Sequence, residues 1–182
     1  QQAVAYGHQG KQYLQSSIGL MEFTTYHFYY PLALLAICSE DFNKKSTYFA
    51  EVLYCQEKIK QWSKYAPDNY LHKHELIAAE IAKVLGEHEQ AAEYYDRAIA
   101  EATKAGYMHE AALAEELAGE FYLSRGRTKI ASYYLMDAYQ SYFDWGALAK
   151  TQELESKHLF ILNCIPKQEL ISDSCKRSNK GL

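Results

Sequence analysis

Cysteine is scarce in this chain and is arranged neither for metal binding nor for a disulfide framework. The four cysteines are Cys38, Cys55, Cys164 and Cys175, with no CxxC pair and no histidine placed to complete a zinc motif. A chain of 182 residues can bury enough apolar surface to fold without disulfides. We therefore expect reduced thiols, a cytoplasmic protein and no bound metal.

No apolar run is long enough to predict a membrane span. The one stretch to consider is Phe23 to Ser39, which has no formally charged residue but contains His27 and Pro31. It falls short of the roughly 20 apolar residues that cross a bilayer. The stretch predicts a buried core helix, which Pro31 should either start or kink because proline lacks the amide proton of an interior position.

Catalytic motifs are missing too. The chain has no HExxH motif, no glycine-rich phosphate loop and no recognisable nucleophile-base pair. We expect no enzymatic activity and no cofactor in the isolated chain. The histidines of His72-Lys73-His74 cannot hold one ion from a regular helix, because residues two apart point about 200° apart. A structural or solvent-facing role is the favoured interpretation.

The composition is that of a soluble globular protein, with 48% hydrophobic and 23% charged residues. Its net charge of -4 is uneven, because Glu75–Gly146 holds 13 acids against 6 bases. An acidic surface repels phosphate groups, so nucleic acid is not an expected partner. The acids Glu110, Glu115 and Glu116 are predicted to form a solvated helix face.

Between Glu75 and Gly146 the sequence repeats itself when residue n is laid over residue n+40. Each copy has a helical apolar pattern that reaches a glycine, followed by a second helical pattern and another glycine. The unit is therefore predicted to be a helix-turn-helix hairpin, and the clearest copies are 75–106 and 115–146. Residues that coincide in this overlay include Glu75 and Glu115, Ala78 and Ala118, Glu80 and Glu120, Gly86 and Gly126, Ala91 and Ala131, Tyr94 and Tyr134, Ala98 and Ala138, and Gly106 and Gly146.

Small residues mark where the two helices of a hairpin should meet. Ala91 and Ala98, with Ala131 and Ala138 in the second copy, allow close approach of the helix axes. The glycines at 86 and 126 are predicted to end the first helices in left-handed backbone conformations. An aromatic ligand platform and packing between helices both suit the tyrosines. Their repeat positions favour packing for Tyr94, Tyr95, Tyr133, Tyr134, Tyr139 and Tyr142.

Further helices are predicted before the repeat. Residues 1–22 are left open, because Gly7 and Gly10 weaken an otherwise amphipathic pattern. Asp41–Lys44 is predicted to be a turn and cap, followed by a helix that ends near Tyr65.

The chain should restart at Pro67, with Asp68 or Asn69 as the N-cap. After the repeat, a helix over about residues 147–162 should cover the end of the stack with Leu148, Leu154, Leu159 and Phe160. The predicted organisation is one helical-repeat domain over residues 1–166, followed by a polar linker or tail over residues 167–182.

The spacing of small and aromatic residues resembles that of tetratricopeptide repeats. The residues that carry the resemblance are Ala79, Gly86, Ala91, Tyr95 and Ala98, then Gly119, Tyr122, Gly126, Ala131 and Ala138. The usual repeat has about 34 residues and often closes with a proline. This one has the longer n+40 period and no such proline. The resemblance implies a relative with lengthened second helices.

A second resemblance covers residues 17–160. The blocks Phe28–Ala36, Ala66–Lys73, Glu93–Ile99, Glu116–Leu123 and Ala138–Ala147 are similar to the helical segment of large multidomain signalling kinases. Those proteins carry a serine/threonine-kinase-like domain, an AAA-type ATPase, this helical segment, a GAF sensor and often a histidine kinase. The resemblance implies an internal module of an ATP-dependent protein kinase whose catalytic parts lie elsewhere. Gln1 in place of methionine suggests an excised or processed chain.

The predicted fold is all-α: a right-handed stack of antiparallel helical hairpins, or tetratricopeptide-like α-solenoid, with about seven or eight helices. The resemblance places ten residues in a concave groove for a protein or peptide: Lys73, Leu76, Glu80, Lys83, Val84, Leu113, Glu116, Glu120, Leu123 and Ser124. The groove glutamates predict a ligand with basic or amide groups.

The leading hypothesis is a non-catalytic interaction module whose partner is a protein, a peptide or a flanking domain of the same polypeptide. Two alternatives stay open: a rigid signal-transmitting spacer between ATPase and sensor domains, and a free-standing peptide-binding adaptor.

Overall fold

The computed structural model describes residues 2–11, 21–40 and 42–158, and no strand occurs among them. The all-α prediction is therefore confirmed for this part of the chain. Its eight helices are α1 (Gln2–Lys11), α2 (Met21–Glu40), α3 (Phe42–Tyr65), α4 (Pro67–Leu85), α5 (His88–Lys104), α6 (Met108–Ser124), α7 (Thr128–Trp145) and α8 (Leu148–Lys157).

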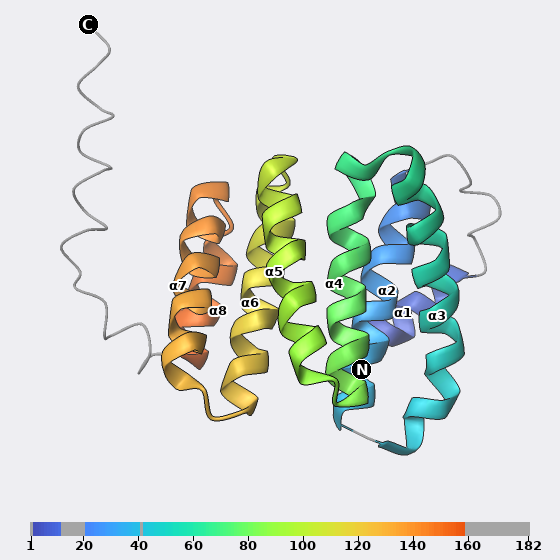
Figure 1. The fold of residues 1–182 in the computed structure, drawn as a ribbon, viewed down its shortest axis with the longest axis horizontal. Helices are drawn as coiled ribbons and strands as arrows, with labels where there is room; N and C mark the ends of the chain where they lie inside the picture. Colours follow the sequence, from blue (N-terminus) through green and yellow to red (C-terminus); the bar gives the residue numbers. More distant parts are fainter. Residues whose placement is uncertain (1, 12–20, 41, 159–182) are drawn as a thin grey trace, which may run out of the picture.

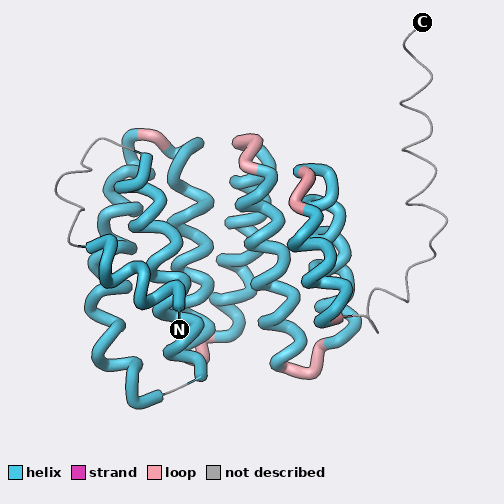
Figure 2. The backbone as a smooth tube through the Cα atoms, turned by 180° about the vertical axis from the view of Figure 1, so that it is seen from behind, coloured by secondary structure: helices cyan, strands magenta, loops and turns pink. Residues whose placement is uncertain are grey.

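Consecutive helices from α2 onward lie side by side and alternate in direction (Figure 1). The most extensive packing is within the pairs α2–α3, α4–α5 and α6–α7, while α3–α4 and α5–α6 contacts join one pair to the next. The turns that follow α4 and α6 lie at one end of the helices, and those that follow α3, α5 and α7 lie at the other (Figures 1 and 2).

Four turns of one design connect the last five helices. Gly86, Gly106, Gly126 and Gly146 all have positive φ, between 70° and 85°. At the first, the amide of Gly86 donates to the carbonyl of Lys83 and the amide of Glu87 donates to that of Ala82. This pair of bonds satisfies carbonyls left free at the helix end. Gly86 and Gly126 therefore end helices as predicted.

The two hairpins of the repeat, α4–α5 and α6–α7, are close-packed along the predicted small residues. Ala91, Ala98, Ala131 and Ala138 are at most 1% exposed. Gly119 on α6 goes further, because an added Cβ would lie 2.6 Å from Cγ of Leu135 on α7. The first and second helices of the two hairpins are similar in length, with 19 and 17 residues in α4 and α5 and 17 and 18 residues in α6 and α7.

The N-terminal helices decide two points that the sequence left open. Gly7 lies inside α1, where an added Cβ would come within 2.4 Å of the Tyr30 ring, so the glycine makes room for α2. Pro31 lies inside α2 rather than at its start. Its missing hydrogen bond is offset by the packing of Phe28, Leu34 and Leu35, none of which is exposed.

Burial confirms α2 as a core helix. Its residues contribute a large part of the main hydrophobic core, together with α3 and α4. Over residues 2–11, 21–40 and 42–158, no helix combines the length and apolar character needed to cross a membrane. Cys38 and Cys55 are buried, whereas Cys164 and Cys175 lie outside the described residues.

Several predicted boundaries also move. α2 ends at Glu40 and α3 begins at Phe42, so the predicted turn and cap over Asp41–Lys44 was too long. The N-cap of α4 is Ala66, without a side-chain cap, and Pro67 takes a first-turn position.

The last described helix begins close to the predicted position. Leu154 is 1% exposed and packs in a small core with Ala112 of α6 and Leu135 of α7, but Leu148 is 58% exposed. Leu159, Phe160 and the predicted linker over residues 167–182 lie outside the described residues.

Candidate functional site

The ten residues predicted to line a groove lie on α4 and α6 but do not form one open surface. Lys73, Leu76, Glu80 and Glu116 are buried, with exposed fractions between 1% and 8%. Leu76 belongs to the hydrophobic core, so the prediction that it faces a partner is wrong. The half-buried members are Lys83, Val84, Leu113, Glu120 and Leu123, and Ser124 is exposed.

Glu80 is committed to contacts inside the first hairpin. The hydroxyl of Tyr95 on α5 donates to its carboxylate, and Lys83 Nζ lies 2.5 Å from the other carboxylate oxygen. Burial and the adjacent carboxylate raise the pKa of Tyr95 well above its usual value, so the hydroxyl remains a donor.

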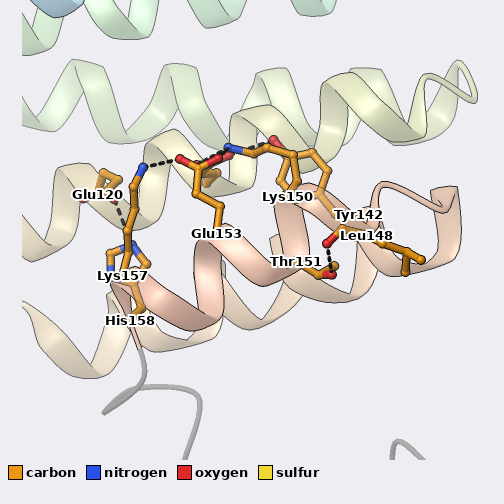
Figure 3. Close-up of polar contacts among 9 residues, drawn as sticks. Glu120, Tyr142, Leu148, Lys150, Thr151, Glu153, Lys157 and His158 are labelled. Carbon is orange, nitrogen blue, oxygen red and sulfur yellow. Dashed lines mark hydrogen bonds and ion pairs between the residues drawn. The ribbon is translucent and has the colours of Figure 1, made fainter.

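Glu116 and Glu120 are committed in the same way to α7 and α8. Tyr142 donates to Glu116 at 2.8 Å, and Lys150 donates to its other oxygen at 2.9 Å. Figure 3 shows Lys150 also reaching Glu153, while Nε2 of His158 lies 2.9 Å from Glu120. The predicted acidic groove is therefore largely neutralised from within.

The histidine weighed as a metal ligand belongs to a buried ion cluster. Nε2 of His72 and Nζ of Lys73 lie 2.5 Å and 2.6 Å from Oε2 of Glu110 on α6. Burial alone would raise the pKa of Glu110, but hydrogen bonds and charge from His72 and Lys73 outweigh it and lower that pKa. Among the described residues no group of His, Cys, Asp and Glu could hold a metal ion.

The acids of α6 are not the predicted solvated face. Glu110, Glu115 and Glu116 are 5%, 8% and 7% exposed. The helix packs against α5 and α7 and also bonds to α4 and α8, so nearly all of its faces are covered.

Glu115 differs from the other two because no cation of the described chain is paired with it. Its Oε2 is buried without a hydrogen-bond partner. Burial raises the pKa of Glu115 to about 7, the hydrogen bond from Ser141 counteracts the rise, and the charge of Asp137 adds to it.

Polar contacts between residues 38 apart connect successive hairpins. Besides His72 with Glu110, Tyr107 donates to Asn69 at 2.8 Å, Tyr134 donates to Asp96, and His158 contacts Glu120. They join α4 to α6, α5 to α7, and α6 to the end of α8. We call these four contacts the interhairpin ties.

An open cleft of about 560 Å³ lies between α3 and α5, with α4 forming its floor. Gln56 of α3 donates from Nε2 to the carbonyl of His74 at 3.1 Å, and its Oε1 is buried without a partner. We call this space the α3–α5 cleft. It is lined by Leu53, Gln56, Glu57, Lys60, His74, Ala78, Ile81, Ala82, Glu87, Gln90 and Tyr94.

A second hollow of about 640 Å³ lies among α1, α2 and α3. Its polar wall is internally paired, because Glu51 accepts bonds from Lys11 at 2.9 Å and from Tyr30 at 2.7 Å. Burial raises the pKa of the Cys55 thiol in this wall to about 12, which keeps the thiol protonated and unreactive.

The site residues predicted from the sequence lie on α4 and α6, and none of them lines the α3–α5 cleft. A signal for the cleft residues was present in the repeat. The overlay of residue n on residue n+40 sets Ala82 against Tyr122 within the second copy, and a small residue opposite a large aromatic one marks a place where the two hairpins cannot pack alike.

Comparison with models of known protein families, with curated proteins and with solved structures found no match for this chain. What the protein does is therefore inferred from its fold and from the geometry just described.

Proposed function

We propose that this chain is a non-catalytic protein-interaction module, a tetratricopeptide-like stack of hairpins that binds a protein, a peptide or a flanking domain of its own polypeptide. The observation that carries the proposal is the α3–α5 cleft, an open space at a junction between hairpins that are otherwise close-packed.

The stacked-hairpin interpretation is supported by two regularities. The positive-φ turn glycines Gly86, Gly106, Gly126 and Gly146 are evenly spaced along the chain, and each interhairpin tie joins residues 38 apart. A constant sequence distance between bonded residues is what a repeated unit produces when each copy contacts only its neighbours.

The binding surface proposed here is the cleft rather than the groove expected from tetratricopeptide repeats. The groove glutamates Glu80, Glu116 and Glu120 already have partners within the chain. A ligand would have to break those contacts, whereas the cleft offers space without displacing any of them.

Photo-crosslinking tests the proposal. A photoreactive amino acid replaces Leu53, which is 49% exposed at the cleft, or Tyr133 on α7, which is 61% exposed and serves as the control. We expect adducts from position 53 but not from 133, and saturable binding by a synthetic peptide of the crosslinked segment. Equal labelling at both positions, or no saturable binding, would contradict an interaction site at the cleft.

The spacer alternative is favoured by the interhairpin ties, since polar contacts between successive hairpins, of which His72–Glu110 is buried, stiffen the stack. A spacer within a large kinase would give a native polypeptide many times larger than the 20.9 kDa of this chain. An immunoblot of source cells measures that size, and a band near 20.9 kDa would leave the free-standing adaptor.

A further inference from the structure

The α3–α5 cleft and the gap between α5 and α7 are two versions of one junction. When residue n is laid over residue n+40, Gln56, Ala82 and Tyr94 of the cleft correspond to Asp96, Tyr122 and Tyr134. The correspondence holds in space as well, because the first three line the same hollow and Tyr134 contacts both Asp96 and Tyr122.

The second gap is closed by a tyrosine. The rings of Tyr122 and Tyr134 stack with centroids 5.4 Å apart and an angle of 11° between planes. The hydroxyl of Tyr134 donates to Asp96, which fixes the ring that Tyr122 covers. Aromatic pairs in this offset arrangement stabilise a contact beyond the area that they bury.

The first junction lacks this filling. Ala82 stands where Tyr122 would be, and Tyr94 lines the open cleft. The guanidinium of Arg97 lies over the Tyr94 ring, 4.6 Å from its centroid, where the second junction has Asp137. In contrast to Tyr134 and Asp96, no hydrogen bond joins the described residues Tyr94 and Gln56, and Oε1 of Gln56 is a buried acceptor without a donor. A buried polar atom in that state costs free energy until a donor reaches it.

We propose that the α3–α5 cleft receives an aromatic side chain of a partner protein, by preference tyrosine, stacked on Tyr94 as Tyr122 is stacked on Tyr134. This deepens the proposed function and rests on it, because it names the kind of residue that anchors the partner. Tyrosine is preferred because its hydroxyl can supply the donor that the Gln56 side of the cleft lacks.

The charges at the cleft guide the choice of probe. Glu57, Glu87 and Lys60 are among its lining residues, so the rim carries charges of both signs. A neutral ligand avoids steering by this mixed rim. N-acetyl-L-tyrosinamide presents the side chain between two uncharged amides, and N-acetyl-L-leucinamide is its apolar, non-aromatic control.

The test is a titration of the ¹⁵N-labelled 182-residue chain with each amide, followed by amide chemical shifts. We expect the tyrosine amide to shift Gln56, Ala82 and Tyr94 in a saturable way, and the leucine amide to leave them unchanged. Tyr94→Leu should weaken binding roughly three- to tenfold, the contribution of an aromatic pair.

Two variants swap the filling residues of the two junctions: one adds a tyrosine at the cleft and the other removes the tyrosine from the α5–α7 gap. Ala82→Tyr should fill the cleft from within and abolish the shifts, while Tyr122→Ala should open the α5–α7 gap and create new shifts at Asp96 and Tyr134. Tyr94→Leu, at a half-buried position, keeps the test decisive should Ala82→Tyr fail to fold.

Equal shifts from both amides, or an unchanged affinity for the tyrosine amide in Tyr94→Leu, would overturn the proposal. An absence of chemical-shift changes at Gln56, Ala82 and Tyr94 of the wild-type chain would overturn it as well. The outcome is separable from that of the proposed function. If a protein partner is crosslinked at another surface and the tyrosine amide causes no shifts at the cleft, only the proposed aromatic anchor is overturned. If the tyrosine amide binds at the cleft but no protein partner is crosslinked, the proposal of an interaction module is overturned.

Discussion

The two hairpins α4–α5 and α6–α7 share a backbone design but handle charge in opposite ways. In the first, Arg97 Nε donates to Glu75 at 2.9 Å, and the Glu75 side chain is 12% exposed. The corresponding residues of the second are Glu115 and Asp137, two acids. Where the first hairpin has an ion pair, the second has two acids, and the buried carboxylate of Glu115 has no cation beside it at this position.

The hairpins also differ at the next acidic position. Glu80 is 2% exposed and bound by Tyr95 and Lys83, whereas its counterpart Glu120 has a side chain that is 42% exposed and contacts His158. The helix positions are the same and the surroundings are not. A repeat therefore specifies where a residue lies on its helix, while the neighbouring hairpin decides whether that place is buried.

The largest expected effect is a difference in the free energy of unfolding between lysine substitutions at Glu80 and at Glu120. Glu80→Lys should lower the free energy of unfolding by about 3–5 kcal/mol, because it leaves a buried, unpaired charge beside Lys83. Glu120→Lys changes a partly exposed contact and should cost roughly 0–1 kcal/mol. Urea denaturation of both variants measures the difference, and equal losses would show that the burial contrast is wrong.

A smaller effect concerns pH and separates Glu115 from Glu75. The pKa of Glu115 is raised in the folded chain from 4.5 to about 7, so the folded state binds its proton more tightly than the unfolded state. This contribution is fully present below pH 4.5 and is lost as pH rises to about 7, a loss of about 3 kcal/mol. Glu115→Gln should therefore stabilise the chain at pH 8 and change little at pH 4.5.

Glu75 should respond with the opposite sign. Burial acts to raise its pKa, but His74 and Arg97 outweigh burial and lower it. Its stabilising contribution is therefore present above the ordinary glutamate pKa and is lost as pH falls through the lowered value. Glu75→Gln should destabilise the chain at pH 8. Melting curves of both variants from pH 4.5 to 8 check the signs, and stabilisation by both substitutions would contradict the contrast.

The two hairpins should respond alike to overpacking, because both are close-packed along their small residues. Ala91→Leu and Ala131→Leu should each cost roughly 1–3 kcal/mol, because neither position leaves room for a larger side chain. Ala100→Leu makes the same change at an exposed position of α5 and should be nearly neutral. Thermal denaturation compares the three. A loss confined to one hairpin would show that the small-residue line is not a shared feature.

The features predictable from sequence are those that one hairpin determines alone. Turn glycines and contact alanines have requirements set by their own backbone and by the adjacent helix, so Gly86 and Ala91 behaved as predicted. The all-α class of the described residues followed from the same local periodicity.

What the sequence did not predict depends on partners far along the chain. Glu116 reads as a surface acid until Tyr142 and Lys150 are known to reach it. Asn69 suits an N-cap, yet it accepts the hydroxyl of Tyr107 from the next hairpin instead. Polar residues of this kind are placed by tertiary bonds, which a pattern of residue types does not contain.

The smallest expected effect comes from a substitution that gives the second hairpin the ion pair of the first. Asp137→Arg places a guanidinium at the position of Arg97 in the first hairpin, where it can pair with Glu115 as Arg97 pairs with Glu75. Because the position is exposed, the gain at pH 8 should be roughly 0.2–1 kcal/mol. It should vanish in the Glu115→Gln background, since the carboxylate to be paired is then absent. A double-mutant cycle by urea denaturation measures this coupling. A gain that survives in that background would come from the removal of Asp137, and Glu115 would then lack a cation for reasons other than the exchange of Arg97 for an acid.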